Sequence, residues 1–184
     1  MRIHGLAVTA FLAGCASSSS QTTLGTAPTQ STTRVSDGTS TSFNVTTRAV
    51  TEPNVASVPY SRDQVWAALP AVFESLNIAP TTRDQMKRVI GNPGFNVRRR
   101  LGTLPLARLI DCGSSQGAAN ADTYELHLIV LTTVLEDGPS SSKLSTTVEA
   151  MGRPVSFSGE YIRCGTLGAL ETRIAEGVKA QLRK

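Results

Sequence analysis

Three cysteines carry most of the chemistry that this sequence predicts, and the first of them predicts lipidation. Cys15 ends the tetrapeptide Leu12-Ala13-Gly14-Cys15, which has the form of a lipobox, with small residues in front of a thiol that can accept diacylglycerol. Arg2 and an apolar run over residues 5–13, too short to span a bilayer, precede it as in an export signal. We therefore expect cleavage before Cys15 and acylation of the new N-terminus. An ordinary secretory signal followed by an incidental cysteine is the alternative.

The other two cysteines, Cys112 and Cys164, belong to the exported part of the chain, where thiols are oxidised. An even number of cysteines in such a part predicts a disulfide between them. The bond would close a loop of about 50 residues and stabilise the fold by about 4 kcal/mol in the chain-entropy account. Two buried free thiols are the alternative.

Residues that could perform catalysis are scarce. His4 is lost with the signal, which leaves His127 as the single histidine of the mature chain, and no cysteine pair has the spacing of a zinc site. The segment Gly113-Ser114-Ser115-Gln116-Gly117 matches the pattern of a nucleophile elbow, but its flanks lack the strand and the helix that an elbow requires. We predict a non-enzymatic protein with no catalytic, cofactor-binding or metal-ligating residues.

The basic run Arg98-Arg99-Arg100 is the strongest remaining functional signal. The net charge is +4, and between residues 83 and 108 Asp84 is the single acid. On a strand, Arg98 and Arg100 would share one face, while Arg99 would point to the other. The functional interpretation of this run is that Arg98 and Arg100 contact an anionic partner: lipid head groups, an envelope polymer or an acidic envelope protein. A solvated strand edge is the alternative, and nucleic acid is not expected because no aromatic residues alternate with the arginines.

Two helices are predicted to support these residues. Ser61 and Gln64 form a capping box at the start of the first, and Pro70 lies inside its pattern, where we expect a kink. The second is expected to begin near Gly165 and to continue to the C-terminus, with Glu171 on an outer face. The apolar stripes are Val65, Trp66, Leu69, Val72, Phe73 and Leu76 in the first helix, and Leu167, Leu170, Ile174, Val178 and Leu182 in the second. Both stripes predict helices that face a core.

Between the helices, apolar residues recur at every second position. Residues 124–135 and 144–150 alternate in this way around a turn at 136–139, which predicts a long antiparallel hairpin. The remaining strand predictions are residues 43–47, and more weakly 78–82, 87–90 and 95–101, the last two separated by Asn92-Pro93-Gly94. An α+β fold, with an antiparallel β-sheet and two helices packed on one face, accommodates this pattern.

The chain divides into three parts. Residues 1–14 are the predicted signal peptide. Serine and threonine dominate residues 15–41 without apolar periodicity, which predicts a lipidated, disordered tether with a reach of roughly 30 Å. An O-glycosylated stalk is the alternative for this part. Residues 42–184 are predicted to form a single α+β domain.

The order of these parts resembles the BamC type of envelope lipoprotein. The features in common are a lipobox, a Ser/Thr tether, a strand, a helix that opens with Val65, Trp66 and Leu69, a sheet and a closing helix. The resemblance implies a helix-grip domain and an accessory role in outer-membrane protein assembly. It covers residues 42–184 in the order of elements, and no functional residue is carried over.

These observations favour a non-enzymatic envelope lipoprotein that binds a protein partner or supports an assembly. Ala16 after the lipidated cysteine is typical of sorting to the outer membrane, so we expect the domain to be anchored there and to face the periplasm. A module that binds a small molecule or a lipid is the alternative. An exposed apolar patch would favour the first function, and a deep apolar pocket the second.

Overall fold

The computed structural model describes residues 29–36, 42–49, 53–115, 117–155 and 160–184. The predicted signal and Cys15 lie outside the described residues. The strands and helices in chain order are β1 (Thr29–Ser36), β2 (Ser42–Ala49), β3 (Asn54–Val58), α1 (Arg62–Ser75), β4 (Thr82–Asp84), β5 (Val89–Arg98), β6 (Arg100–Leu101), β7 (Leu104–Pro105), a 3-10 turn (Leu106–Arg108), β8 (Ile110–Asp111), β9 (Ser114–Ser115), β10 (Ala118–Ala119), α2 (Asn120–Thr123), β11 (Tyr124–Glu136), β12 (Ser142–Pro154), β13 (Ile162–Thr166) and α3 (Ala169–Leu182).

A seven-stranded antiparallel sheet forms the main layer, and the predicted long hairpin lies at its centre. β11 and β12 pair along 13 residues each, and along β11 buried apolar residues alternate with half-exposed Glu125 and His127. β5 pairs with the other side of β11, and β4 pairs with β5. β3 and β13 pair with different parts of β12, and β8 pairs with β13. The periodicity of the sequence thus predicted the central hairpin correctly.

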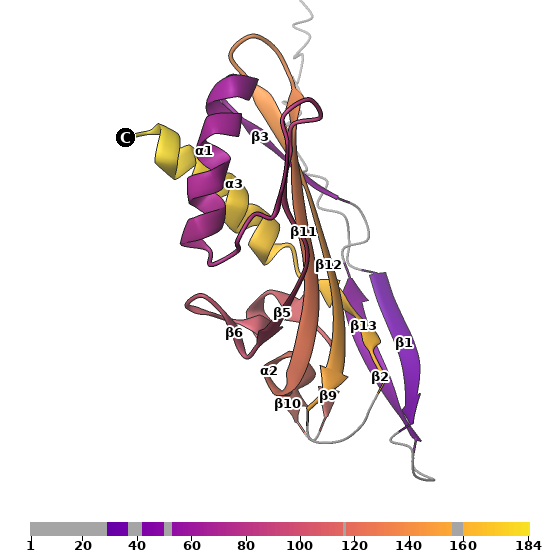
Figure 1. Ribbon diagram of the computed structural model, residues 1–184. Helices are drawn as coiled ribbons and strands as arrows, with labels where there is room; N and C mark the ends of the chain where they lie inside the picture. The colour runs from indigo at the N-terminus through magenta and orange to yellow at the C-terminus, as the bar shows by residue number, and fades with distance from the viewer. Residues whose placement is uncertain (1–28, 37–41, 50–52, 116, 156–159) are drawn as a thin grey trace, which may run out of the picture.

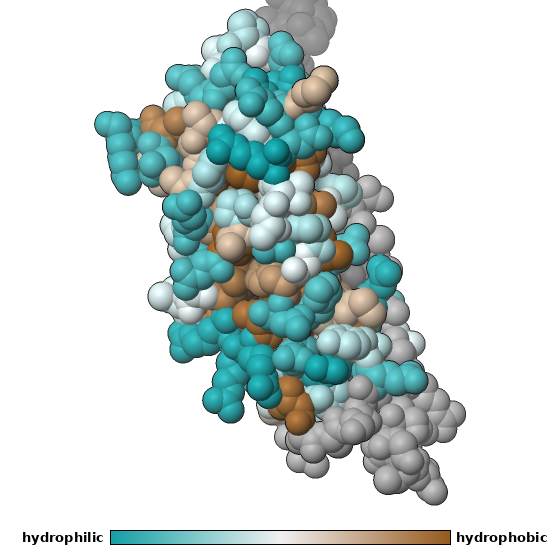
Figure 2. All heavy atoms as spheres, in the orientation of Figure 1, coloured by the Kyte–Doolittle hydropathy of each residue, from teal (hydrophilic) through white to brown (hydrophobic). Residues whose placement is uncertain are grey.

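Helices α1 and α3 cover the same face of this sheet (Figure 1), which confirms the predicted α+β fold. The two helices pack closely, since a Cβ atom on Gly177 would lie only 2.8 Å from Cγ1 of Val72. Leu69, Phe73 and Ile174 are fully buried between the helices and the sheet. Viewed from the same side, hydrophilic side chains cover most of the surface, with hydrophobic atoms visible between them (Figure 2).

The predicted capping box at the start of α1 is confirmed. The Ser61 hydroxyl accepts a hydrogen bond from the backbone N–H of Gln64, whose side chain accepts one from the backbone N–H of Ser61. α1 continues through Pro70 as one element, although proline removes one hydrogen bond of the helix. The buried stripe on either side, including Trp66 and Phe73, stabilises the helix across this position.

The second helix begins later than the predicted start near Gly165. Gly165 and Thr166 instead pair with β8, and α3 begins after Gly168, which has a left-handed φ of 77°. Leu167, assigned to the apolar stripe, is consequently exposed. The prediction for Glu171 was also wrong: it lies in the first turn of α3, facing back to Thr166, and its side chain is buried.

The predicted break at Asn92-Pro93-Gly94 is a β-bulge inside a continuous β5. The register of β5 against β11 shifts between Leu128 and Val130, and the Asn92 side chain accepts a hydrogen bond from the N–H of Gly94. A bulge leaves residues out of the ladder, so the missing N–H of Pro93 does not interrupt the sheet. The weak prediction for residues 78–82 corresponds to β4 only at Thr82, because β4 covers Thr82–Asp84.

Residues 29–36 differ from the predicted disordered tether. They form β1, which pairs with β2 from Thr29 opposite Ala49 to Ser36 opposite Ser42. The three threonines and the valine of β1 favour extended backbone, and the polar composition concealed this preference. β2 includes the predicted strand at residues 43–47 and confirms it.

The predicted disulfide between Cys112 and Cys164 is present. It joins the segment after β8 to β13, and both cysteines are buried in the core. None of the described helices is long and apolar enough to cross a membrane.

Candidate anion-binding site

The arginine run does not lie on one strand. β5 ends at Arg98, and Arg99 has a left-handed φ of 63°. Arg100 then begins β6, which forms a small hairpin with β7, and its guanidinium donates to the carbonyl oxygen of Thr103 at 2.5 Å. The prediction that Arg98 and Arg100 share one face of a strand was therefore wrong, because the bend at Arg99 ends the alternation on which it depended.

The structure instead brings Arg98 and Arg99 together at the edge of a recess of about 550 Å³. Its lining residues come from the end of β5, from α2, from the start of β11 and from the end of β12. They are Arg98, Arg99, Asp122, Thr123, Tyr124 and Val155. We call this feature the arginine recess.

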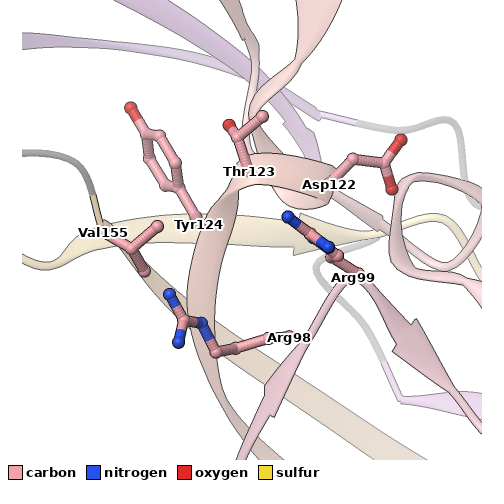
Figure 3. Close-up of a pocket in the computed structure, with 6 residues that line it drawn as sticks. All are labelled: Arg98, Arg99, Asp122, Thr123, Tyr124 and Val155. Carbon is pink, nitrogen blue, oxygen red and sulfur yellow. The ribbon is translucent and has the colours of Figure 1, made fainter.

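Strand pairing explains why these residues meet. Arg98 lies opposite Glu125 in β11, so the preceding residue Tyr124 borders the end of β5. Tyr124 in turn lies opposite Pro154, the last residue of β12, which places Val155, directly after that strand, beside it. In Figure 3 the guanidinium of Arg98 extends toward Val155 and that of Arg99 toward α2.

Neither guanidinium has a hydrogen bond or an ion pair with a described residue. Glu125, which lies opposite Arg98 in β11, is paired with Arg153 at 2.7 Å, and Asp122 accepts a hydrogen bond from the N–H of Ala107 at 3.3 Å. Within the described ranges, no carboxylate lies within 4 Å of Arg98 or Arg99. Arginine stays protonated in proteins, so two positive charges border the recess against the single carboxylate of Asp122, and they can bind an anion.

Tyr124 forms the buried wall of the recess. Burial raises the pKa of Tyr124, and a hydrogen bond with the Ser115 side chain opposes that rise. In Figure 3 the tyrosine hydroxyl points away from both arginines. A phenol whose pKa is raised stays neutral at ordinary pH, so Tyr124 does not cancel the positive charge.

The serine segment and the histidine that were considered for catalysis, and not expected to perform it, lie outside the recess. Ser114–Ser115 pairs with Ala118–Ala119 in a short hairpin, so the Gly-x-Ser-x-Gly segment does not form the strand-to-helix turn of a nucleophile elbow. His127 bonds through Nδ1 to Oδ1 of Asn96 at 2.9 Å, as a hydrogen-bonded histidine on the polar face of the sheet. In the described part of the chain, no three His, Cys, Asp or Glu residues are grouped closely enough to hold a metal ion.

The other basic residues of the 83–108 segment are separated from the recess. Arg83 and Arg88 lie over the ring of Trp66, at 5.3 and 5.4 Å from its centroid. Trp66 is buried, as expected of a core residue, and it also fixes these two cations. The sequence indicated the basic run but not the place of Arg99 in the recess, because a left-handed φ at an arginine cannot be predicted from residue type.

The chain matches no family model, no curated protein and no solved structure. A function for this chain is therefore inferred from the geometry of the arginine recess.

Proposed function

We propose that this protein is a non-enzymatic, lipid-anchored envelope protein whose folded domain binds an anionic group of a protein partner in the arginine recess. One observation carries the proposal: the guanidinium groups of Arg98 and Arg99 border one recess, and neither has an ion-pair partner among the described residues. Guanidinium groups bind carboxylates and phosphates through paired, charge-assisted hydrogen bonds.

The exposure of the recess favours a group on a larger partner over a free small molecule. Arg98, Arg99, Asp122 and Thr123 are all exposed, whereas sites for small molecules bury most of the ligand. The volume of about 550 Å³ nevertheless lies in the range of such sites, and this supports a small anionic ligand as the second candidate.

In this proposal the lipobox cysteine, Cys15, carries the lipid anchor. The anchor lies in the outer membrane, and the folded domain faces the periplasm. The Cys112–Cys164 disulfide supports export, because disulfides persist in oxidising compartments. An accessory role in an envelope assembly, as in the BamC-type lipoproteins, is compatible with a domain that binds a partner through one end of its sheet.

The test compares two anionic probes on the detergent-solubilised full chain. Binding of a fluorescent polyglutamate peptide is measured by anisotropy, and binding of inorganic pyrophosphate by calorimetry. We expect the Arg98→Ser/Arg99→Ser variant to bind polyglutamate more than tenfold more weakly, since a hydrogen bond to a charged group contributes about 1.5–3 kcal/mol. Added salt should weaken binding to the wild type.

Arg100→Ser is the matched control, because Arg100 belongs to the same basic run but bonds to Thr103 outside the recess. It should bind polyglutamate nearly as well as the wild type. Equal loss in both variants would indicate that only net charge matters and would reject the recess as the site. Tight binding of pyrophosphate without binding of polyglutamate would favour the second candidate.

A further inference from the structure

The arginine recess contains one acid as well as two arginines. Asp122 belongs to α2 and is one of the residues that line the recess. Its Oδ1 accepts a hydrogen bond from the N–H of Ala107 at 3.3 Å. Among the described residues, its Oδ2 has no hydrogen-bond partner and Asp122 forms no ion pair. The lining therefore presents an unpaired carboxylate together with two unpaired guanidinium groups.

The interior of the fold holds Asp122 in this place. Asn120, the first residue of α2, is buried, and its side chain donates a hydrogen bond to the carbonyl oxygen of Cys112 at 3.0 Å. The N–H of Asn120 donates to the carbonyl oxygen of Gly113 at 2.9 Å. Cys112 is in turn bonded to Cys164 of β13. Because α2 is fastened to the core at its first residue, the carboxylate of Asp122 is positioned before any ligand arrives.

The other residues of the lining carry no charge. The hydroxyl of Thr123 donates to the carbonyl oxygen of Asn120 at 3.2 Å, the phenol of Tyr124 is neutral, and Val155 is apolar. The charges of the lining are thus two positive charges from the arginines and one negative charge from Asp122. A group that complements this lining carries two negative charges and one positive charge. A purely acidic group would bring a negative charge to Asp122, and like charges repel.

We propose that the arginine recess selects an acidic segment that also carries a basic side chain, with a lysine placed beside two acidic residues. This inference rests on the proposed function, because it specifies which segment of the protein partner the recess binds. The carboxylates of the segment bind Arg98 and Arg99 through charge-assisted hydrogen bonds, and its ammonium group binds the free oxygen of Asp122. In Figure 3 Asp122 lies on the side of the Arg99 guanidinium away from Arg98, which leaves the negative group at one end of the lining.

The test compares two fluorescent peptides on the detergent-solubilised full chain by anisotropy. One peptide repeats the sequence Glu-Lys-Glu, and the other is identical except that its lysines are acetylated, which removes their charge. We expect the wild type to bind the lysine peptide about three- to fivefold more tightly, at the upper end of what an exposed ion pair contributes. Attraction by net charge alone would give the opposite order, because the acetylated peptide is the more negative one.

Asp122→Asn separates the carboxylate from its structural role, since it removes the charge and keeps an oxygen acceptor for the N–H of Ala107. This variant should bind the acetylated peptide at least as tightly as the lysine peptide. Glu149→Gln is the matched control, because it removes the same charge from an exposed residue of β12 that does not line the recess. It should keep the preference of the wild type.

Wild-type protein that binds both peptides equally, or that prefers the acetylated peptide, would overturn the inference. Equal loss of the preference in Asp122→Asn and Glu149→Gln would overturn it as well. Failure of the proposed function looks different, since the Arg98→Ser/Arg99→Ser variant would then bind both peptides as tightly as the wild type does. If that variant loses both peptides while the wild type does not discriminate between them, the recess is the site and selection by Asp122 is rejected.

Discussion

At the scale of single residues, Glu171 is the most unusual group of the core. It is 3% exposed, and its Oε1 accepts a hydrogen bond from the Thr166 hydroxyl at 2.7 Å. Oε2 has no hydrogen-bond partner among the described residues. Burial raises the pKa of Glu171, and the hydrogen bond from Thr166 opposes this rise only in part. The folded protein therefore holds the proton of Glu171 more tightly than the unfolded chain does.

The raised pKa predicts how stability depends on pH. The folded-state pKa lies above the unfolded value of about 4.3. The stability that the folded protein gains from binding this proton is therefore complete below the unfolded pKa, and it is lost as pH rises through the folded pKa. Glu171→Gln keeps an oxygen acceptor for Thr166 and removes the charge. We expect the variant to be more stable than the wild type near neutral pH, by about 1 kcal/mol, and equally stable in acid.

Chemical unfolding at several pH values measures this difference. Glu176→Gln is the control, because it removes a carboxylate from the exposed side of the same helix, where Glu176 pairs with Lys179. If Glu171→Gln and the wild type show parallel pH profiles, folding does not raise the pKa of Glu171.

Residue types predicted some of these environments and not others. The capping residues Ser61 and Gln64 and the two cysteines have side chains with few structural roles, so their partners could be inferred from spacing alone. The environments of Glu171 and Arg99 could not be inferred in this way. The environment of Glu171 depends on where α3 begins, and that of Arg99 on a left-handed bend at the end of β5, and both are decided by tertiary pairing.

At the scale of elements, the apolar periodicity of the sequence predicted the helix and the hairpin that bury one face along their whole length. α1 and the β11–β12 hairpin follow their apolar periods closely, because one face of each is buried along its whole length. The bulge in β5 and the pairing of β1 with β2 were missed, since each depends on a neighbouring strand that the sequence does not identify. The arginine recess was missed for the same reason: it exists only where four elements end together.

The disulfide is the covalent link between two of these elements, and its loss can be measured. We expect Cys112→Ser and Cys164→Ser each to lower the free energy of unfolding by several kcal/mol, on the order of 4 kcal/mol in the chain-entropy account. The double variant should lose no more than either single variant, because the same bond is absent in all three. Denaturant unfolding of the wild type and the three variants provides the comparison.

Mass measurement after alkylation gives an independent check of the bond. The unreduced native protein should gain no label at Cys112 or Cys164, and the reduced, unfolded protein should gain one at each. Two cysteines that react in the native protein without a reductant would show that the bond does not form in solution.

At the scale of the whole molecule, the arginine recess lies at one end of β5 and of the central hairpin. β5 is ten residues long, so its other end is separated from the recess by roughly 30 Å of extended chain. The sheet, braced by α1 and α3 on one face, holds the recess at one end of an elongated domain (Figure 1).

Attachment of the whole molecule to a membrane is assigned to the proposed anchor at Cys15, since stable anchoring requires more than one acyl chain. We therefore expect Cys15→Ser to lose labelled palmitate and to leave the membrane fraction, while the wild type keeps both. The Arg98→Ser/Arg99→Ser variant should keep its palmitate and stay with the membrane, because its acyl chains are unaffected. Equal membrane retention of Cys15→Ser and the wild type, without palmitate on either, would mean that the protein is not anchored by lipid at this cysteine.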